Sequence, residues 1–177
     1  KLDAAILFSD ILTIPDSFGL GVEFVEKEGP VFNNPINSST DISNLDHFDP
    51  ESLDYVYKAV KNIKNSLSEE IPLIGFCGSP WTLAAYSIEG RSSKDFEKTL
   101  NFLVSNQKDV HNLLTKYTDA CFLYLRRQVQ SGADVIQIFD SWANLLTKEG
   151  LIEYSFNYIN ALISALKLDP VTKNIPV

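Results

Sequence analysis

The segment PLIGFCGSP, residues 72–80, decides the class of fold. Its first five residues form an apolar run with neither a helical nor an alternating period, and a Gly–Pro turn follows. Such a run is typical of a β-strand buried on both faces of a parallel sheet. Two other runs have the same character, AAILF at residues 4–8 and VIQIF at residues 135–139. The sequence therefore predicts three strands.

Between these apolar runs, several segments have apolar residues at the three- and four-residue spacing of amphipathic helices. The pair Asp49–Pro50 supplies an N-cap and a proline at the first position of a strongly amphipathic helix. From Ser93 the pattern predicts two consecutive helices separated near Asn106, and residues 147–166 form another helix. The order of strands and helices requires right-handed crossovers and a parallel sheet.

Two architectures fit this order, a doubly wound sheet and a (β/α)8 barrel. Residues 175–177 read as the opening of a fourth strand. Three and a half units in 177 residues extrapolate to roughly 350 to 400 residues for eight, within the range of such barrels. If the fold is a barrel, this chain is its first half. The chain also has no methionine and starts at Lys1, so we expect the native N-terminus to lie upstream.

The formal charge of −8 is concentrated in residues 1–56, which carry eleven acids against Lys1 and Lys27. Within it, residues 10–49 are too rich in Pro, Gly, Asn, Ser and acids for a long regular element, although a short hairpin fits residues 21–32. This acidic balance argues against nucleic-acid binding. The region is expected to be a solvated surface.

Composition and cysteine content also indicate the cellular compartment of the protein. Apolar residues make up 45% of the chain, but no run approaches the roughly 20 that a membrane helix needs. The only cysteines, Cys77 and Cys121, are far apart in sequence, without the spacing of a metal site, and no secretory leader precedes the first strand. We therefore expect a cytoplasmic protein without a membrane span or a disulfide framework.

Each predicted strand ends on a phenylalanine followed by small or polar residues: Phe8-Ser9-Asp10, Phe76-Cys77-Gly78 and Phe139-Asp140-Ser141. The carboxyl ends of parallel strands line the functional crevice, so this pattern predicts a pocket for a large, partly apolar ligand. The alternative for the phenylalanines is ordinary core packing.

At the second strand end the chain reads GFCGSPWTLAAYSIEG, residues 75–90. This segment resembles the G-F-x-G-x-P-W-T-L-x-x-Y-x-x-E-G signature of the uroporphyrinogen decarboxylase family, and residues 4–24 and 132–143 resemble its neighbouring strand segments. The resemblance implies a (β/α)8 TIM barrel in the α/β class, with residues 1–177 as an incomplete single domain, the first half. It also implies an enzyme of haem synthesis that needs no cofactor or metal. The substrate would be the tetrapyrrole uroporphyrinogen III, which loses its four acetate carboxyls to give coproporphyrinogen III, and the full-length protein would be a homodimer.

The resemblance also assigns residues. It makes Asp10 the catalytic, substrate-holding aspartate, and it implies that Tyr86, Ser141, Phe8, Phe76, Gly78 and Phe139 bind substrate. Two parts of the family pattern are absent from this sequence, an R-Q-A-G-R segment and a late histidine, and neither His47 nor His111 has the context of the latter.

The chemistry suits a carboxylate at position 10. Loss of CO₂ from an acetate arm leaves an electron pair that a protonated pyrrole can accept, and a carboxylate in a desolvated pocket stabilises that cation. Each residue has a structural alternative: a turn cap for Asp10, a turn or helix cap for Ser141, and rim packing with a solvated hydroxyl for Tyr86.

Two other functions compete with this interpretation. One is a zinc-dependent methyltransferase of the same superfamily, whose ligands would lie beyond residue 177. The other is a non-catalytic binding module, a doubly wound domain that holds a nucleotide or a partner, but neither G-x-G-x-x-G nor a P-loop occurs to bind a phosphate. Because half a barrel leaves two sheet edges bare, residues 1–177 alone are expected to be inactive.

Overall fold

The computed structural model describes residues 3–177 and contains a three-stranded parallel sheet in the order β1-β4-β5. The strands are β1 (Ala5–Ile6), β4 (Leu73–Gly78) and β5 (Val135–Phe139). Ala5 pairs with Leu73, and β4 and β5 pair along their length. The prediction of three parallel strands is confirmed, although β1 is shorter than residues 4–8.

The amphipathic segments form the expected helices. A 3₁₀ turn, η2 (Pro50–Leu53), leads into α3 (Asp54–Ser66), and α5 (Glu97–Ser105) and α6 (Gln107–Gln130) follow later in the chain. They are separated at Asn106, as predicted, because its φ of −136° and ψ of 42° are not helical. The last helical region is continuous through α7 (Lys148–Gly150), the π-helical η4 (Leu151–Phe156) and α8 (Asn157–Leu168), and Thr147 caps its start.

Two features differ from the expectation. Helix α4 (Pro80–Glu89) was not predicted as a helix, because eight of its ten residues are buried and its sequence has no polar stripe. At residues 175–177 no strand forms. The backbone N–H of Ile136 donates to the carbonyl of Pro176 over 2.9 Å, but proline has no N–H with which to continue a ladder.

The acidic region contains the predicted hairpin, between β2 (Val22–Val25) and β3 (Gly29–Phe32), which are antiparallel. Short helical pieces surround it: α1 (Thr13–Pro15), η1 (Asp16–Leu20) and α2 (Ser39–Ser43), the last begun by a capping box on Ser38. One further 3₁₀ turn, η3 (Ala143–Leu145), follows β5.

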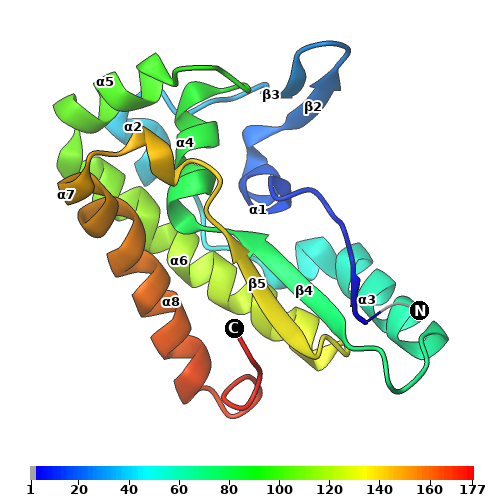
Figure 1. The fold of residues 1–177 in the computed structure, drawn as a ribbon. Helices are drawn as coiled ribbons and strands as arrows, with labels where there is room; N and C mark the ends of the chain where they lie inside the picture. Colours follow the sequence, from blue (N-terminus) through cyan, green and yellow to red (C-terminus); the bar gives the residue numbers. More distant parts are fainter. Residues whose placement is uncertain (1–2) are drawn as a thin grey trace.

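Helices cover one face of the sheet. Figure 1 shows α6 and α8 along β4 and β5, with α3 beside the short β1. Cys77 and Cys121 meet where α6 packs on β4, and burial raises the pKa of the Cys121 thiol well above its usual value. On the other face, Ile6 and Phe8 are 43% and 81% exposed, and no helix of the described residues covers them. None of the helices within residues 3–177 is long and apolar enough to cross a membrane.

Candidate active site

A row of three aromatic rings crosses the carboxyl ends of the strands. The Phe8 and Phe76 rings stack with centroids 5.8 Å apart, and Phe139 meets Phe76 edge-on at 5.5 Å. Phe76 is 2% exposed because the rings of Phe8 and Phe139 flank it, whereas Phe8 is 81% exposed. The Phe76 ring thus supports its neighbours in the row, and Phe8 offers an apolar ring to a ligand or to another part of the protein.

The backbone of Phe76 is held by a buried glutamine. In a parallel strand, alternate residues direct their backbone N–H and carbonyl toward the same neighbouring strand. The Ile74 carbonyl accepts from the Leu7 N–H, so the backbone of Phe76 also points toward the side of β1, where that strand has already ended. Gln128 of α6 replaces the missing strand: its Oε1 accepts from the Phe76 N–H at 3.0 Å, and its Nε2 donates to the Phe76 carbonyl at 2.9 Å. Gly75 leaves room for this amide, since a Cβ there would lie 2.7 Å from Oε1.

Asp10 follows β1 and is half-buried. Its Oδ1 accepts a hydrogen bond from the Leu12 N–H at 2.7 Å, which is the turn-capping contact expected of such an aspartate. Within residues 3–177, its other oxygen has no hydrogen bond and the carboxylate forms no ion pair. The cap therefore orients the carboxylate and leaves one oxygen available.

The turn that carries Asp10 is anchored from α6. The Tyr124 hydroxyl lies 3.2 Å from Oγ of Ser9, within hydrogen-bond distance. Burial raises the pKa of Tyr124 to about 12, so its hydroxyl is protonated at neutral pH. Beside it, Asp10 and Asp16 line a pocket of about 160 Å³ that is walled by Phe24 and Tyr55.

This pocket is electrostatically negative. Partial burial, together with the charges of Asp16 and Asp10, raises the pKa of Tyr55. No basic side chain lines the pocket among the described residues. Its chemistry favours a ligand that presents N–H donors or a positive charge.

Tyr86 lies on α4 and is half-buried in an aromatic cluster. Its ring meets Phe96 and Trp142 edge-on, each with centroids 5.7 Å away, and Phe96 and Trp142 are 4.3 Å apart. Phe96 adopts a φ of +48° although it is not glycine, which indicates that this packing outweighs the backbone strain. The Tyr86 ring thus packs within this cluster, and its hydroxyl has no hydrogen bond within residues 3–177.

Ser141 and Gly78 differ in their surroundings. Ser141 follows β5, is exposed, and its hydroxyl has no hydrogen bond in the part of the chain that the structure describes. Gly78 is buried, and a Cβ there would lie 2.9 Å from Cδ2 of Leu83. Packing of α4 against the strand end therefore accounts for glycine at position 78.

Sequence reasoning missed Asp140 as a structural centre. Its Oδ1 accepts from the hydroxyls of Ser79 at 2.6 Å and Thr82 at 3.1 Å, and its Oδ2 accepts from Ser155. These three donors are fully buried. The only sequence signal was the position of Asp140 directly after a strand, and its partners lie on α4 and η4, distant in sequence.

The predicted residues share one edge of the sheet without direct contact between the polar ones. Asp10 follows β1, α4 with Tyr86 follows β4, and Ser141 follows β5. Since β4 lies between the outer strands, β1 and β5 are two strand spacings apart, roughly 10 Å. That width suits a large ligand that spans the strand ends. Within residues 3–177, no three His, Cys, Asp or Glu side chains are grouped to bind a metal ion.

A parallel α/β fold with an available carboxylate, free hydroxyls and exposed aromatic surface at its carboxyl edge has the form of a small-molecule site. The family model described as "Uroporphyrinogen decarboxylase (URO-D)" matches residues 1–177, so the chain belongs to this family.

Curated relatives agree. Uroporphyrinogen decarboxylases of Serratia proteamaculans and Pseudoalteromonas atlantica are 46% and 47% identical over 177 residues, which is 99% of this chain and 50% of each relative. The chain thus spans about half the length of the curated relatives it matches. A solved methyltransferase from Methanosarcina mazei superposes with a TM-score of 0.75, covering 93% of this chain and 49% of that one. At 18% identity this shows a shared fold alone.

Proposed function

We propose that the full-length protein is a uroporphyrinogen decarboxylase. It converts uroporphyrinogen III to coproporphyrinogen III in haem biosynthesis by removing the carboxyl groups of four acetate side chains, without a cofactor. The observation that carries this proposal is the family match over the whole chain, together with the available carboxylate of Asp10 at the strand ends. The same evidence favours a decarboxylase over a methyltransferase, because the similarity to the methyltransferase is one of fold alone.

Asp10 supplies the electrostatic part of the reaction. Protonation of a pyrrole carbon makes the ring an electron acceptor, and the bond to CO₂ then breaks with its electrons entering the ring. The methylene that remains gains a proton to become a methyl group, and the ring carbon loses the proton it had accepted. Within residues 3–177 the Asp10 carboxylate forms no ion pair, so its oxygen without a hydrogen bond can stabilise the ring's positive charge and accept pyrrole N–H bonds. The negative pocket beside it supports this role.

The remaining site residues bind and orient the macrocycle. The exposed ring of Phe8, supported by Phe76, provides an apolar wall. Tyr86 and Ser141 offer hydroxyls to the acetate or propionate oxygens, and Phe139 and the backbone at Gly78 complete the edge.

The architecture of the whole protein is part of the proposal. We place the three parallel strands in the first half of a (β/α)8 barrel, where the uncovered face of the sheet becomes the packed interior. The exposure of Ile6 and Phe8 on that face supports this placement. The proposed protein is cytoplasmic and forms a homodimer.

The test is direct. Full-length protein is incubated with uroporphyrinogen III under reducing conditions, and the products are separated by their number of carboxylates. Accumulation of the four-carboxylate product is expected, with Asp10→Asn as the impaired variant. A folded full-length protein that leaves the substrate unchanged would refute the proposal.

A further inference from the structure

The first turn of α4 is hydrogen-bonded to the end of β5. The backbone N–H of Ser79 donates to the carbonyl of Phe139 at 2.8 Å. The hydroxyls of Ser79 and Thr82 both donate to Oδ1 of Asp140, at 2.6 and 3.1 Å. These contacts fix the chain immediately before Ser141.

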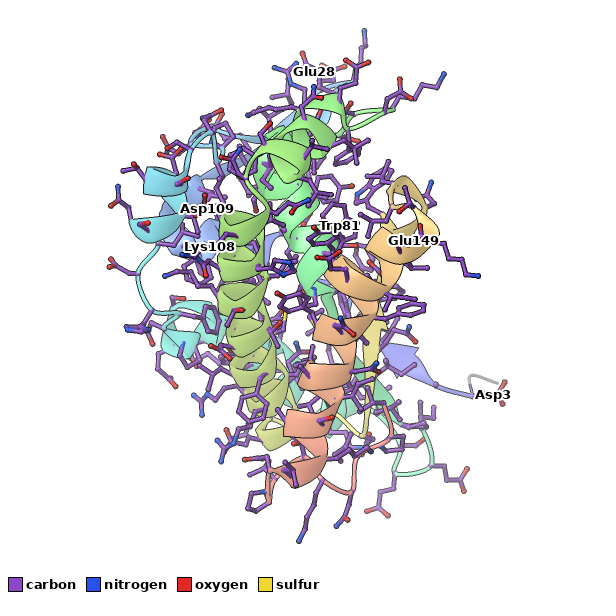
Figure 2. All side chains as sticks on the ribbon, turned by 90° about the vertical axis from the view of Figure 1, so that its left-hand side faces the viewer. Asp3, Glu28, Trp81, Lys108, Asp109 and Glu149 are labelled. Carbon is purple, nitrogen blue, oxygen red and sulfur yellow. The ribbon has the colours of Figure 1, made fainter. Side chains whose placement is uncertain are left out.

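The same turn also holds the chain immediately after Ser141. The N–H of Trp142 donates to Oγ1 of Thr82 at 3.4 Å, and Nε1 of Trp81 donates to the carbonyl of Trp142 at 2.9 Å. Trp81 is fully buried, and Figure 2 shows it in the interior between the helices. The strand-end clamp consists of the four residues that hold this turn: Ser79, Trp81, Thr82 and Asp140.

A carboxylate is well suited to the centre of this clamp. Asp140 receives three hydroxyl donors, one of them from Ser155 on η4, and ionised carboxylates only accept hydrogen bonds. Within residues 3–177 it forms no ion pair, so the hydroxyls alone satisfy its charge. Bonds to a charged acceptor are stronger than neutral ones, which makes the turn stiff.

We propose that the strand-end clamp positions Ser141 for the substrate. The hydroxyl of Ser141 is exposed and has no hydrogen bond within residues 3–177, whereas the residues on both sides of it are tied to α4. The clamp thus sets where this hydroxyl lies relative to the aromatic row while leaving it free to bind a substrate carboxylate. The clamp residues act through Ser141 and are positioning residues. The inference rests on the proposed function, because it requires a substrate at Ser141.

A double-mutant cycle in the full-length protein tests this coupling. Thr82→Val removes the hydroxyl that bonds both Asp140 and the Trp142 N–H, and Thr82→Ser keeps it as the matched control. Thr82→Val is expected to lower kcat/KM for uroporphyrinogen roughly tenfold, about as much as Ser141→Ala, while Thr82→Ser retains most activity. In the Ser141→Ala background, Thr82→Val should change kcat/KM less than about twofold, because the hydroxyl it positions is already absent.

A purely structural role gives a different result, since Thr82→Val would then cost the same factor in both backgrounds. Additive effects, or a folded Thr82→Val protein with unchanged kcat/KM, overturn the proposal. If Thr82→Val does not fold, Ser155→Ala removes one donor to Asp140 from outside α4 and enters the same cycle. A folded wild type without turnover refutes both the proposed function and the clamp, whereas an active wild type with additive variants refutes only the clamp.

Discussion

Replacing Asp10 by asparagine in the full-length protein is expected to preserve the fold and remove most of the activity. The amide oxygen of asparagine can still accept the Leu12 N–H, so the turn after β1 persists. What disappears is the negative charge on the oxygen that has no hydrogen bond within residues 3–177.

The size of the loss follows from the position of the carboxylate. Asp10 is half-buried, so an effective dielectric constant of about 20 is more suitable than that of water. A ring cation about 4 to 6 Å away is then stabilised by about 3 to 4 kcal/mol. Loss of that energy from the transition state lowers kcat roughly a hundredfold to a thousandfold.

The assay measures decarboxylation rates together with thermal unfolding by circular dichroism. Glu70→Gln is the control, because it also removes one negative charge but is exposed and lies before β4, at the opposite end of the strands. Its kcat should stay within about twofold of wild type, as for a screened surface charge. An Asp10→Asn protein with the wild-type melting temperature and near-normal kcat would remove Asp10 from the mechanism.

Three further outcomes are expected of the full-length protein. Tyr86→Phe and Ser141→Ala should each cost about 1 to 3 kcal/mol in kcat/KM, as single lost hydrogen bonds to charged groups; steady-state kinetics would contradict this if either variant were inactive. Gln128→Met leaves the buried N–H and carbonyl of Phe76 unpaired, so denaturant unfolding should show a loss of about 2 to 4 kcal/mol, and an unchanged midpoint would be inconsistent with the bridging role. Asp134→Asn should lower the melting temperature at pH 7, and this difference should shrink as the pH falls below the ordinary aspartate pKa of about 4. Burial opposes ionisation of Asp134, but the Leu73 N–H and the Lys64 ammonium hold its pKa below the usual value. Its contribution to stability therefore exists above the unfolded-state pKa and is lost as the pH falls through the folded-state pKa. A difference in melting temperature that persists in strong acid would argue against this role.

The fold was largely predictable where burial leaves a period in the sequence. β5 coincides with the apolar run at residues 135–139, and α3 and α6 show an apolar stripe because their other sides face solvent. Helix α4 could not be predicted in this way. It packs between α5, α6 and the strand end, so eight of its ten positions are buried and the helical period disappears.

The strand ends could be located from sequence, but the environment of each side chain could not. Three phenylalanines occupy equivalent places in the pattern, and yet Phe76 is buried while Phe8 is exposed. The difference arises because β4 is central, so the rings of Phe8 and Phe139 flank Phe76, whereas Phe8 follows the short edge strand β1. These are relations between segments more than 50 residues apart.

The two strand-end aspartates show how structure distinguishes what sequence presents as alike. Asp10 and Asp140 each come within two residues of a strand's last phenylalanine, and either could have been the catalytic carboxylate. Asp140 has three buried hydroxyls directed at its two oxygens, so binding a ligand there would require breaking bonds to a charged acceptor. One oxygen of Asp10 accepts a hydrogen bond within its own turn, and the other has no hydrogen bond within residues 3–177 and lies beside a negative pocket. A carboxylate that must respond to charge developing on a substrate needs that remaining capacity, and therefore Asp10 suits the chemistry while Asp140 suits the positioning of its neighbour.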